Sequence, residues 1–343
     1  MGYADGTMPP TGLTGVVVNQ PGAMPGDRSY VSGDGPHWRR IAVDGTELER
    51  HSRSYWWNLG SLPWVSLSHG STGNFRRARR LPDGDIVAIH EGLGLVRYGA
   101  AGSDWALGLG IHHDVRWDDD GTLWTLGRKI EVVGGTARYR DEVLHVDAAD
   151  GSVLGRCDLV TAVERGSQPG LLAQTLRKDD PLHTNSVVRV PAEASAVLGG
   201  GDTFVSFRNV SALAALDFEA CAVTWTGRGN FKMQHDAILV EGPAVLLFNN
   251  GGHSGASRVM ELSLPSLHTV WAWGGPPEMK LNSPQLGAVS RLENGNTLVT
   301  SSEQGVAYEV TRDREVVWAF HNPHRAGENG ELVAALFEVE VLP

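Results

Sequence analysis

Six copies of one hairpin pattern recur along the chain and constrain its fold more than any other feature. Each copy is an alternating apolar strand, a short turn with Asp, Gly or charge, and a second strand that often carries Trp. The copies begin at Trp38, Leu95, Val143, Leu213, Arg258 and Val306. The intervals of 57, 48, 70, 45 and 48 residues are typical of β-propeller blades, in which each blade is a four-stranded sheet.

Ahead of five of these copies lies a second hairpin of its own type. These hairpins begin at Arg76, His113, His183, His235 and Gly287, and three contain the turn pairs DG or NG. The sixth is incomplete, because only VVVNQ and RSYVSG precede Trp38, and VAALFEVEVLP near the C-terminus reads as a lone strand. We therefore predict an all-β fold: a six-bladed β-propeller, one domain over residues 1–343, closed by N- and C-terminal strands. The C-terminal strand is expected to complete the N-terminal blade.

Composition narrows the range of partners. The formal net charge of −11 provides no general basic surface for nucleic acid. The sequence contains no stretch of 18 apolar residues, so we expect no membrane span. The N-terminus has neither a basic start nor an apolar run, so we expect no secretory signal and a cytoplasmic protein. Cys157 and Cys221 are interpreted as two buried small apolar residues rather than a disulfide framework.

Two stretches interrupt the repeat and are interpreted as insertions at loop tips. Residues 51–73 are rich in Trp, and residues 158–182 have the pattern of one or two short helices. Four aromatic residues of the first stretch are candidates for a wall over an aromatic substrate, with packing between blades as the alternative. They are Tyr55, Trp56, Trp57 and Trp64.

Other motifs carry less information about function. The basic run RRARR at 76–80 is one strand whose alternate residues face opposite sides, and we expect it to supply solvated charge at an edge and a loop. The GGG at 199–201 precedes a strand and is followed by no helix, so it is interpreted as a turn and not as a phosphate-binding loop.

Histidines occupy the same position in several of the predicted inner hairpins. The innermost strand lines the channel and its neighbour runs antiparallel to it, so the start of the first strand and the end of the second meet at one mouth of the channel. The residues expected there are His90, His112, His113, Arg128, His183, Asn185, Arg208, Asn209, His235, Asn249, Asn250, Gln285 and Ser301. Burying several imidazoles together costs free energy unless each has a partner or a use, which indicates an active site.

Short motifs around these positions carry a family resemblance. The ordered set HHD (112–114), HTNSV (183–187), SFRN (206–209) and QHDA (234–237), extended by SRVMEL (257–262) and SPQLGAVSRLENGNTLV (283–299), resembles bacterial arylsulfate sulfotransferases. Members of that family are six-bladed propellers that move a sulfuryl group between phenols through a sulfated histidine, without a nucleotide donor. The resemblance implies an enzyme that needs no cofactor, takes an aryl sulfate and a phenolic or other hydroxylated acceptor, and acts in specialised metabolism.

The resemblance assigns catalytic roles to His235, His113, His183 and Arg208. His235 matches the sulfated nucleophile, and an imidazole can attack sulfur and later leave. Arg208 and Asn185 are suited to stabilise charge that spreads over the equatorial oxygens, and His113 or His183 to move the phenol proton near neutral pH. The further residues expected to bind substrate are Asn185, His112, Asn209, Asn249, Gln285 and His90.

Two other functions fit the same residues. A metal-dependent oxygenase, lyase or isomerase is one, because Fe(II) and Zn(II) accept imidazole ligands, which would be His113, His183 and His235 with His90 or His112. Convergence of the ring nitrogens on one point distinguishes that alternative. A non-catalytic binding platform is the other, and it predicts that substitution of His235 leaves function untouched.

Overall fold

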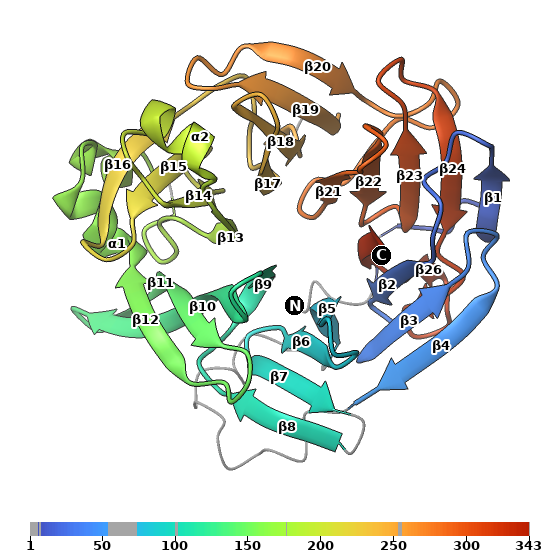
Figure 1. Cartoon of the computed structure of the whole chain (residues 1–343), viewed down its shortest axis with the longest axis horizontal. Helices are drawn as coiled ribbons and strands as arrows, with labels where there is room; N and C mark the ends of the chain where they lie inside the picture. The colour runs from blue at the N-terminus through green and yellow to red at the C-terminus, as the bar shows by residue number, and fades with distance from the viewer. Residues whose placement is uncertain are drawn as a thin grey trace.

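Six antiparallel sheets stand in a ring, with one edge strand of each sheet nearest the centre (Figure 1). The computed structural model describes residues 6, 8–53, 74–99, 102–175, 177–252 and 256–342. The predicted six-bladed β-propeller is therefore confirmed. We number the blades 1 to 6 along the chain, and the innermost strand of each blade is the one nearest the channel.

Blades 2 to 5 each consist of four consecutive strands, which follow one another from the channel outward. Blade 2 contains β5 (Phe75–Arg80), β6 (Ile86–His90), β7 (Gly94–Gly99) and β8 (Gly102–Leu107). Blade 3 contains β9 (His112–Asp118), β10 (Thr122–Val133), β11 (Thr136–Asp147) and β12 (Val153–Asp158). Blade 4 contains β13 (Thr184–Arg189), β14 (Thr203–Phe207), β15 (Ala212–Asp217) and β16 (Ala222–Gly227). Blade 5 contains β17 (His235–Val240), β18 (Ala244–Asn249), β19 (Arg258–Ser263) and β20 (Thr269–Trp273).

Both ends of the chain close the ring. Blade 1 contains β27 (Leu336–Val341) as its innermost strand, then β2 (Arg28–Ser32), β3 (His37–Ile41) and β4 (Glu47–Ser52). Blade 6 contains β21 (Ala288–Arg291), β22 (Thr297–Ser301), β23 (Val306–Val310) and β24 (Val316–His321), with β1 (Gly15–Asn19) as a fifth, outermost strand. The C-terminal strand thus completes blade 1 as predicted.

The placement of β1 differs from the prediction, which assigned the segment VVVNQ to the inner hairpin of blade 1. β1 pairs instead with β24 in blade 6. Because β27 already pairs with β2 in blade 1, β1 extends the outer edge of blade 6 and satisfies backbone groups there that would otherwise stand unpaired.

Short helices fill the stretch at 158–182, as expected. Helix α1 (Leu159–Arg165) begins at Asp158, whose side chain accepts a hydrogen bond from the backbone N–H of Thr161 at 2.8 Å. The 3₁₀ segments η3 (Pro169–Gln174) and η4 (Ala196–Leu198), helix α2 (Ala192–Ser195) and the small hairpin of β25 (Arg325–Ala326) and β26 (Leu332–Val333) complete the elements. No helix in the described ranges has the length and apolar character needed to cross a membrane. The Trp-rich candidates at 55–57 and 64 lie outside the described residues.

The core lies between the blades. In β6, Val87 and Ile89 pack with buried residues of blade 3 such as Val115, whereas Ile86 and Ala88 pack with blade 1. This alternation follows from the two-residue period of a strand. Each blade is therefore apolar on both faces and presents polar groups at its ends, where the functional residues gather.

Cys157 and Cys221 form a disulfide, contrary to the interpretation that they are two free apolar residues. Cys157 lies near the end of β12 in blade 3, and Cys221 lies in the turn between β15 and β16 in blade 4. The sequence alone does not reveal that these positions, 64 residues apart, are brought to a Cα–Cα distance of 5.2 Å at the junction of two blades. Such bonds are typical of oxidising compartments. The disulfide therefore does not favour the cytoplasmic location that the sequence predicts.

Candidate active site

The innermost strands of four consecutive blades carry a register shift near their first residues. In β5 the shift lies between Phe75 and Arg77, in β13 between Thr184 and Ser186, and in β17 between His235 and Ile238. In β9 the corresponding shift leaves His113 and Asp114 between the paired residues His112 and Val115. β-Bulges redirect side chains and are frequent beside active sites.

Unusual backbone conformations accompany these bulges. His113, His183 and Asp236 have φ values of 60°, 48° and 49°, in the left-handed region that costs about 1–3 kcal/mol for a residue other than glycine. Strain of this kind persists where the surrounding structure holds it, and it concentrates at functional sites. The bulged ends of the innermost strands are therefore the candidate location of an active site.

Three histidines from three blades meet there, and we call them the channel histidines: His113, His183 and His235. The ring centroids of His113 and His183 lie 5.1 Å apart in an edge-to-face arrangement, and those of His113 and His235 lie 6.2 Å apart. The structure thus brings together the three histidines that the sequence placed at one repeat position.

Asn250 fixes the orientation of the His235 ring. Its side-chain N–H groups donate to the carbonyl oxygens of Ser283 at 2.5 Å and Leu286 at 2.8 Å, so its Oδ1 faces Nδ1 of His235 at 2.8 Å. An amide oxygen only accepts, so Nδ1 carries the proton, and the carbonyl of Met233 at 3.2 Å favours the same tautomer. The lone pair of the neutral ring therefore resides on Nε2.

Asp180 holds His183 in a similar way. Its carboxylate accepts a hydrogen bond from Nδ1 of His183 at 2.5 Å and lies 3.5 Å from the guanidinium of Arg128. Arg128 also donates to Asp141 at 2.8 Å. The His183 side chain, 24% exposed, is thus an imidazole oriented by a carboxylate, which is the usual arrangement of a general base.

His112 and His113 share a hydrogen bond between their Nδ1 atoms, which lie 2.7 Å apart. Nε2 of His112 lies 3.5 Å from Asp141. Glu91 approaches the same ring nitrogen of His113: one carboxylate oxygen accepts from the backbone N–H of His113 at 3.4 Å, and the other lies 3.8 Å from its Nδ1. His112 is therefore a support for His113, not a fourth member facing the other rings.

The channel histidines are held neutral. Burial, reinforced by neighbouring positive groups, sets the pKa of His113 and of His235 well below the usual value. Burial also lowers the pKa of His183, although Asp180 acts in the opposite direction. At neutral pH each ring keeps a nitrogen lone pair, as a nucleophile or a base requires.

Arg208 lies beside the channel histidines, where its charge helps to lower the pKa of His183 and His235 after the effect of burial. Its Nη1 donates to Asn209 at 2.9 Å, and Asn209 donates to the carbonyl of Asp180 at 2.6 Å. Asn185 donates to the carbonyl of Gln234 at 2.7 Å, and its buried Oδ1 has no hydrogen-bond partner among the described residues. These contacts join Asn209 and Asn185 to the segments that carry His183 and His235.

Three predicted site residues have other contacts. His90 shares a hydrogen bond of 2.6 Å with the Tyr98 hydroxyl and packs on Phe75 within blade 2. The Asn249 side chain accepts from the backbone N–H groups of Lys232 and Gly251. Gln285 donates its backbone N–H to Glu303 at 2.7 Å. These bonds join the three residues to groups other than the channel histidines.

The run RRARR is not solvated charge, contrary to the prediction. Arg76, Arg77 and Arg79 are buried, and only Arg80 is exposed. Both faces of the innermost strand are covered by the neighbouring blades and only its free edge lines the channel, so the alternation of a strand gives no solvated side there. Along with Asp180 and Glu91, these arginines are the functional candidates that the sequence analysis missed.

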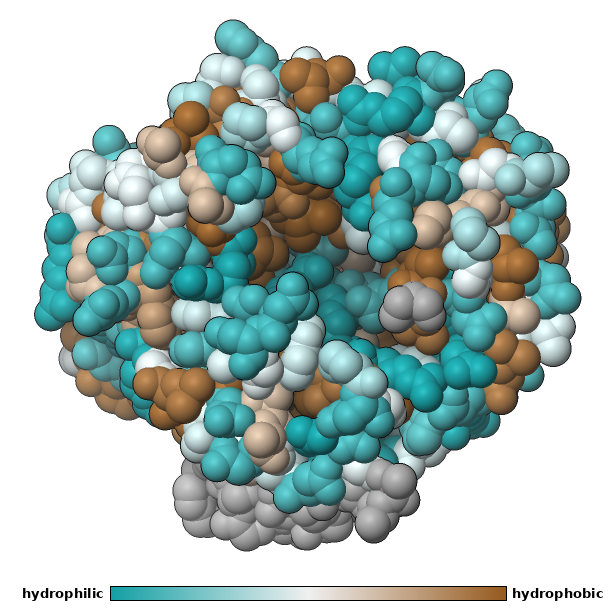
Figure 2. Space-filling view, in the orientation of Figure 1, coloured by the Kyte–Doolittle hydropathy of each residue, from teal (hydrophilic) through white to brown (hydrophobic). Residues whose placement is uncertain are grey.

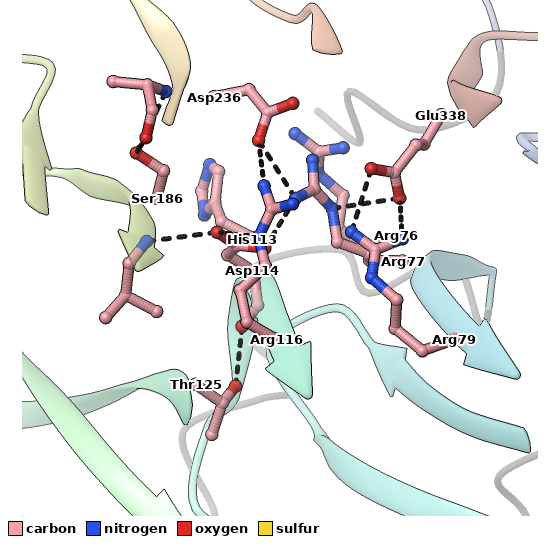
Figure 3. A network of polar contacts seen from close by, with 12 residues as sticks. Arg76, Arg77, Arg79, His113, Asp114, Arg116, Thr125, Ser186, Asp236 and Glu338 are labelled. Atoms are coloured by element: carbon pink, nitrogen blue, oxygen red, sulfur yellow. Dashed lines mark hydrogen bonds and ion pairs between the residues drawn. The ribbon is translucent and has the colours of Figure 1, made fainter. Parts of the chain in front are cut away.

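Deeper contacts form a second group, the ion-pair cluster, shown in Figure 3: Arg77, Arg79, Asp114, Arg116, Asp236 and Glu338. Arg77 pairs with Asp114 at 2.5 Å, Asp236 at 3.1 Å and Glu338 at 3.3 Å. The second carboxylate oxygens of Asp114 and Asp236 also accept backbone N–H groups of the next blades, from Val187 at 3.0 Å and Val289 at 2.8 Å. The cluster therefore ties the innermost strands together beside the channel histidines.

No group of three or more His, Cys, Asp or Glu side chains in the described ranges is arranged to hold a metal ion. Nδ1 of His183 and Nδ1 of His235 are each directed at a protein partner, not at a common point. Figure 2 shows that the molecule is hollowed at the centre of the ring, with hydrophilic residues in the hollow and hydrophobic residues on part of its wall. The arrangement provides neutral imidazoles and a guanidinium at the end of the channel.

Comparisons with known proteins agree with this architecture. The sequence model of the arylsulfotransferase (ASST) family matches residues 97–323, more than half of the chain. A search of curated proteins finds no match.

Solved structures share the fold at low sequence identity. A protein of unknown function from Bacteroides caccae aligns with a TM-score of 0.58 at 11% identity, over 92% of this chain and 98% of its own. The WD40 β-propeller domain of Doa1 aligns with a TM-score of 0.51 at 9% identity, over 98% and 95%. A streptogramin B lyase aligns with a TM-score of 0.50 at 10% identity, over 98% and 96%.

Proposed function

The chain belongs to the arylsulfotransferase (ASST) family, and from this premise we propose that it transfers a sulfuryl group from an aryl sulfate to a phenolic or other hydroxylated acceptor through His235. The observation that carries the proposal is the bond from Nδ1 of His235 to Oδ1 of Asn250. That bond leaves the lone pair of a buried, neutral imidazole on Nε2, where a nucleophile needs it.

In the first half-reaction Nε2 of His235 attacks the sulfur of the aryl sulfate. The N–S bond forms as the S–O bond to the aryl group breaks, and the aryloxide leaves with that electron pair. The sulfated ring acquires a positive charge that the Nδ1–H bond to Asn250 stabilises. Arg208 and Asn185 stabilise the negative charge on the sulfuryl oxygens.

In the second half-reaction the acceptor hydroxyl gives its proton to Nε2 of His183, and its oxygen attacks sulfur. The N–S bond breaks and its electrons return to Nε2 of His235. Asp180 stabilises the His183 imidazolium through their bond at 2.5 Å, and that proton then passes to the departed aryloxide or to water. His113 lies edge-on to His183 and limits the space in which the acceptor oxygen approaches.

Turnover of a nitrophenyl sulfate with a phenol acceptor tests the proposal. His235→Gln should lower kcat by at least about a thousandfold, because the nucleophile is lost. The matched control is His145→Gln, since His145 stacks on Trp124 at 4.3 Å in an outer strand and should leave turnover unchanged. Full activity of His235→Gln contradicts the proposal.

Removal of bound metal separates the proposal from the metal-dependent alternative. Dialysis of the wild-type protein against a chelator should leave turnover unchanged, because every step above uses side chains alone. Loss of turnover that is restored by Zn²⁺ or Fe²⁺ supports the alternative.

A further inference from the structure

Arg76 is a buried arginine that the proposed reaction does not yet use. It is the bulged residue between Phe75 and Arg77 at the start of β5, in the blade next to that of His113. Its side chain is 7% exposed. Arg208 belongs to blade 4, so the two guanidinium groups reach the channel mouth from blades on either side of blade 3.

The pairing of Arg76 is weak for a buried guanidinium. Among the described residues it makes one ion pair, from Nε to Glu91 at 3.6 Å, and lies over the Phe337 ring at 5.2 Å. Figure 3 shows Arg77 and Arg79, by contrast, joined to carboxylates by dashed lines. A buried cation with so little compensation is poised to accept an anion.

Glu91 links Arg76 to the reaction site. The same carboxylate that pairs with Arg76 accepts from the backbone N–H of His113 and approaches its ring. The Glu91 side chain is 37% exposed, so water can solvate it if it leaves Arg76. Arg76 also contributes to the low pKa of both His113 and His235, after burial, which agrees with a position beside them.

We propose that Arg76 forms a second oxyanion subsite, in which the sulfuryl group of the donor replaces the Glu91 carboxylate as the counterion of the guanidinium. This inference rests on the proposed function. One monoanion replaces another, so the charge around Arg76 is unchanged, and Glu91 passes into solvent. With Arg208 on the far side, the sulfuryl oxygens then lie between two guanidinium groups while sulfur bonds to His235.

Binding of inorganic sulfate, measured by calorimetry on the full chain without substrate, tests the subsite independently of turnover. Arg76→Gln should weaken sulfate binding about ten- to hundredfold, the range for hydrogen bonds to charged groups. Glu91→Gln should strengthen it, because the competing carboxylate is gone. The control Arg80→Gln, on the same strand but exposed, should not change it. Thermal melts confirm that each variant is folded, and a tightening in Glu91→Gln cannot arise from misfolding.

Kinetics with two acceptors identify which anion Arg76 receives. Arg76→Gln should reduce kcat/KM for the donor, and it should change kcat/KM for a neutral phenol and for a carboxylated phenol by the same factor. A loss confined to the carboxylated phenol overturns the proposal, because Arg76 then binds the acceptor carboxylate. Unchanged sulfate binding in both Arg76→Gln and Glu91→Gln also overturns it. If His235 does not become sulfated, the proposed function is wrong. The sulfate-binding measurement still tests the Arg76 subsite in that case.

Discussion

The channel histidines and the ion-pair cluster are built from neighbouring residues yet have opposite electrostatics. Three pairs of consecutive residues each have one member in the site, formed by the channel histidines and Arg76, and one in the cluster: Arg76 and Arg77, His113 and Asp114, and His235 and Asp236. The first member of each pair lies in the site and has few or neutral partners, whereas the second lies in the cluster and is tied by charged contacts.

The two groups differ because of what surrounds each charge. Burial lowers the pKa of Arg76, whereas Asp114 and Asp236 outweigh burial and raise that of Arg77 well above its usual value. Likewise Arg116 and Arg77 outweigh burial and hold the pKa of Asp114 below its usual range. The charges of the cluster are paired with one another, and these ion pairs hold the innermost strands in place. The site can therefore contain neutral histidines and a weakly paired arginine that bind a substrate.

The largest expected effect on stability comes from the cluster. Arg77→Met should lower the free energy of unfolding by about 3–5 kcal/mol, because it leaves buried carboxylates short of a partner. Urea denaturation measures this, with Arg80→Met as the control, since its ion pair with Glu49 is exposed and contributes about 0–1 kcal/mol. Equal stability of the two variants contradicts the claim that the ion-pair cluster stabilises the fold more than the exposed ion pair of Arg80.

A substitution beside the site should act on activity in preference to stability. Asn250→Ala removes the acceptor that fixes the His235 tautomer and should lower kcat about ten- to hundredfold, with a smaller change in KM. Steady-state kinetics and a denaturation curve of the same variant separate the two effects. A variant that unfolds readily but turns over normally assigns Asn250 to the framework.

The two groups should titrate in different pH windows. The channel histidines have lowered pKa values in the folded protein, so the unfolded chain binds more protons once the pH falls below about 6.5. Stability is then complete above that pH and declines below it by up to about 1.4 kcal/mol per pH unit for each histidine.

The carboxylates of the cluster respond only in stronger acid. Their lowered pKa values stabilise the fold above the ordinary value of 3.8 and lose that effect as the pH falls further. Denaturation of the wild type and of His113→Gln between about pH 7.5 and pH 4.5 measures the first window. The variant should show a shallower decline, and identical slopes contradict the assignment.

The sequence predicted the propeller and the three histidines because both depend on the repeat. Each hairpin has its own turn and alternation, and equivalent positions in equivalent strands must meet at one mouth. Both Asn249 and Asn250 were expected at this mouth, and Asn249 was assigned to substrate binding, but the side chain that bonds His235 is that of Asn250.

What the repeat does not encode is how the blades contact one another. The partners of Arg77 lie on blades 1, 3 and 5, far away in sequence, so RRARR was interpreted as solvated charge. The same limit hid the Cys157–Cys221 bond and the pairing of β1 with β24. These contacts are set by ring closure and not by local pattern.

The central claim is that a sulfuryl group passes through His235, and the intact mass of the protein after brief exposure to an aryl sulfate without acceptor tests it most directly. The wild type should gain the mass of one SO₃ group, mapped by peptide fragmentation to His235, and lose it when phenol is added. His235→Gln should gain nothing. An unmodified wild-type protein that still turns over the donor, or an SO₃ group on another residue, contradicts the account.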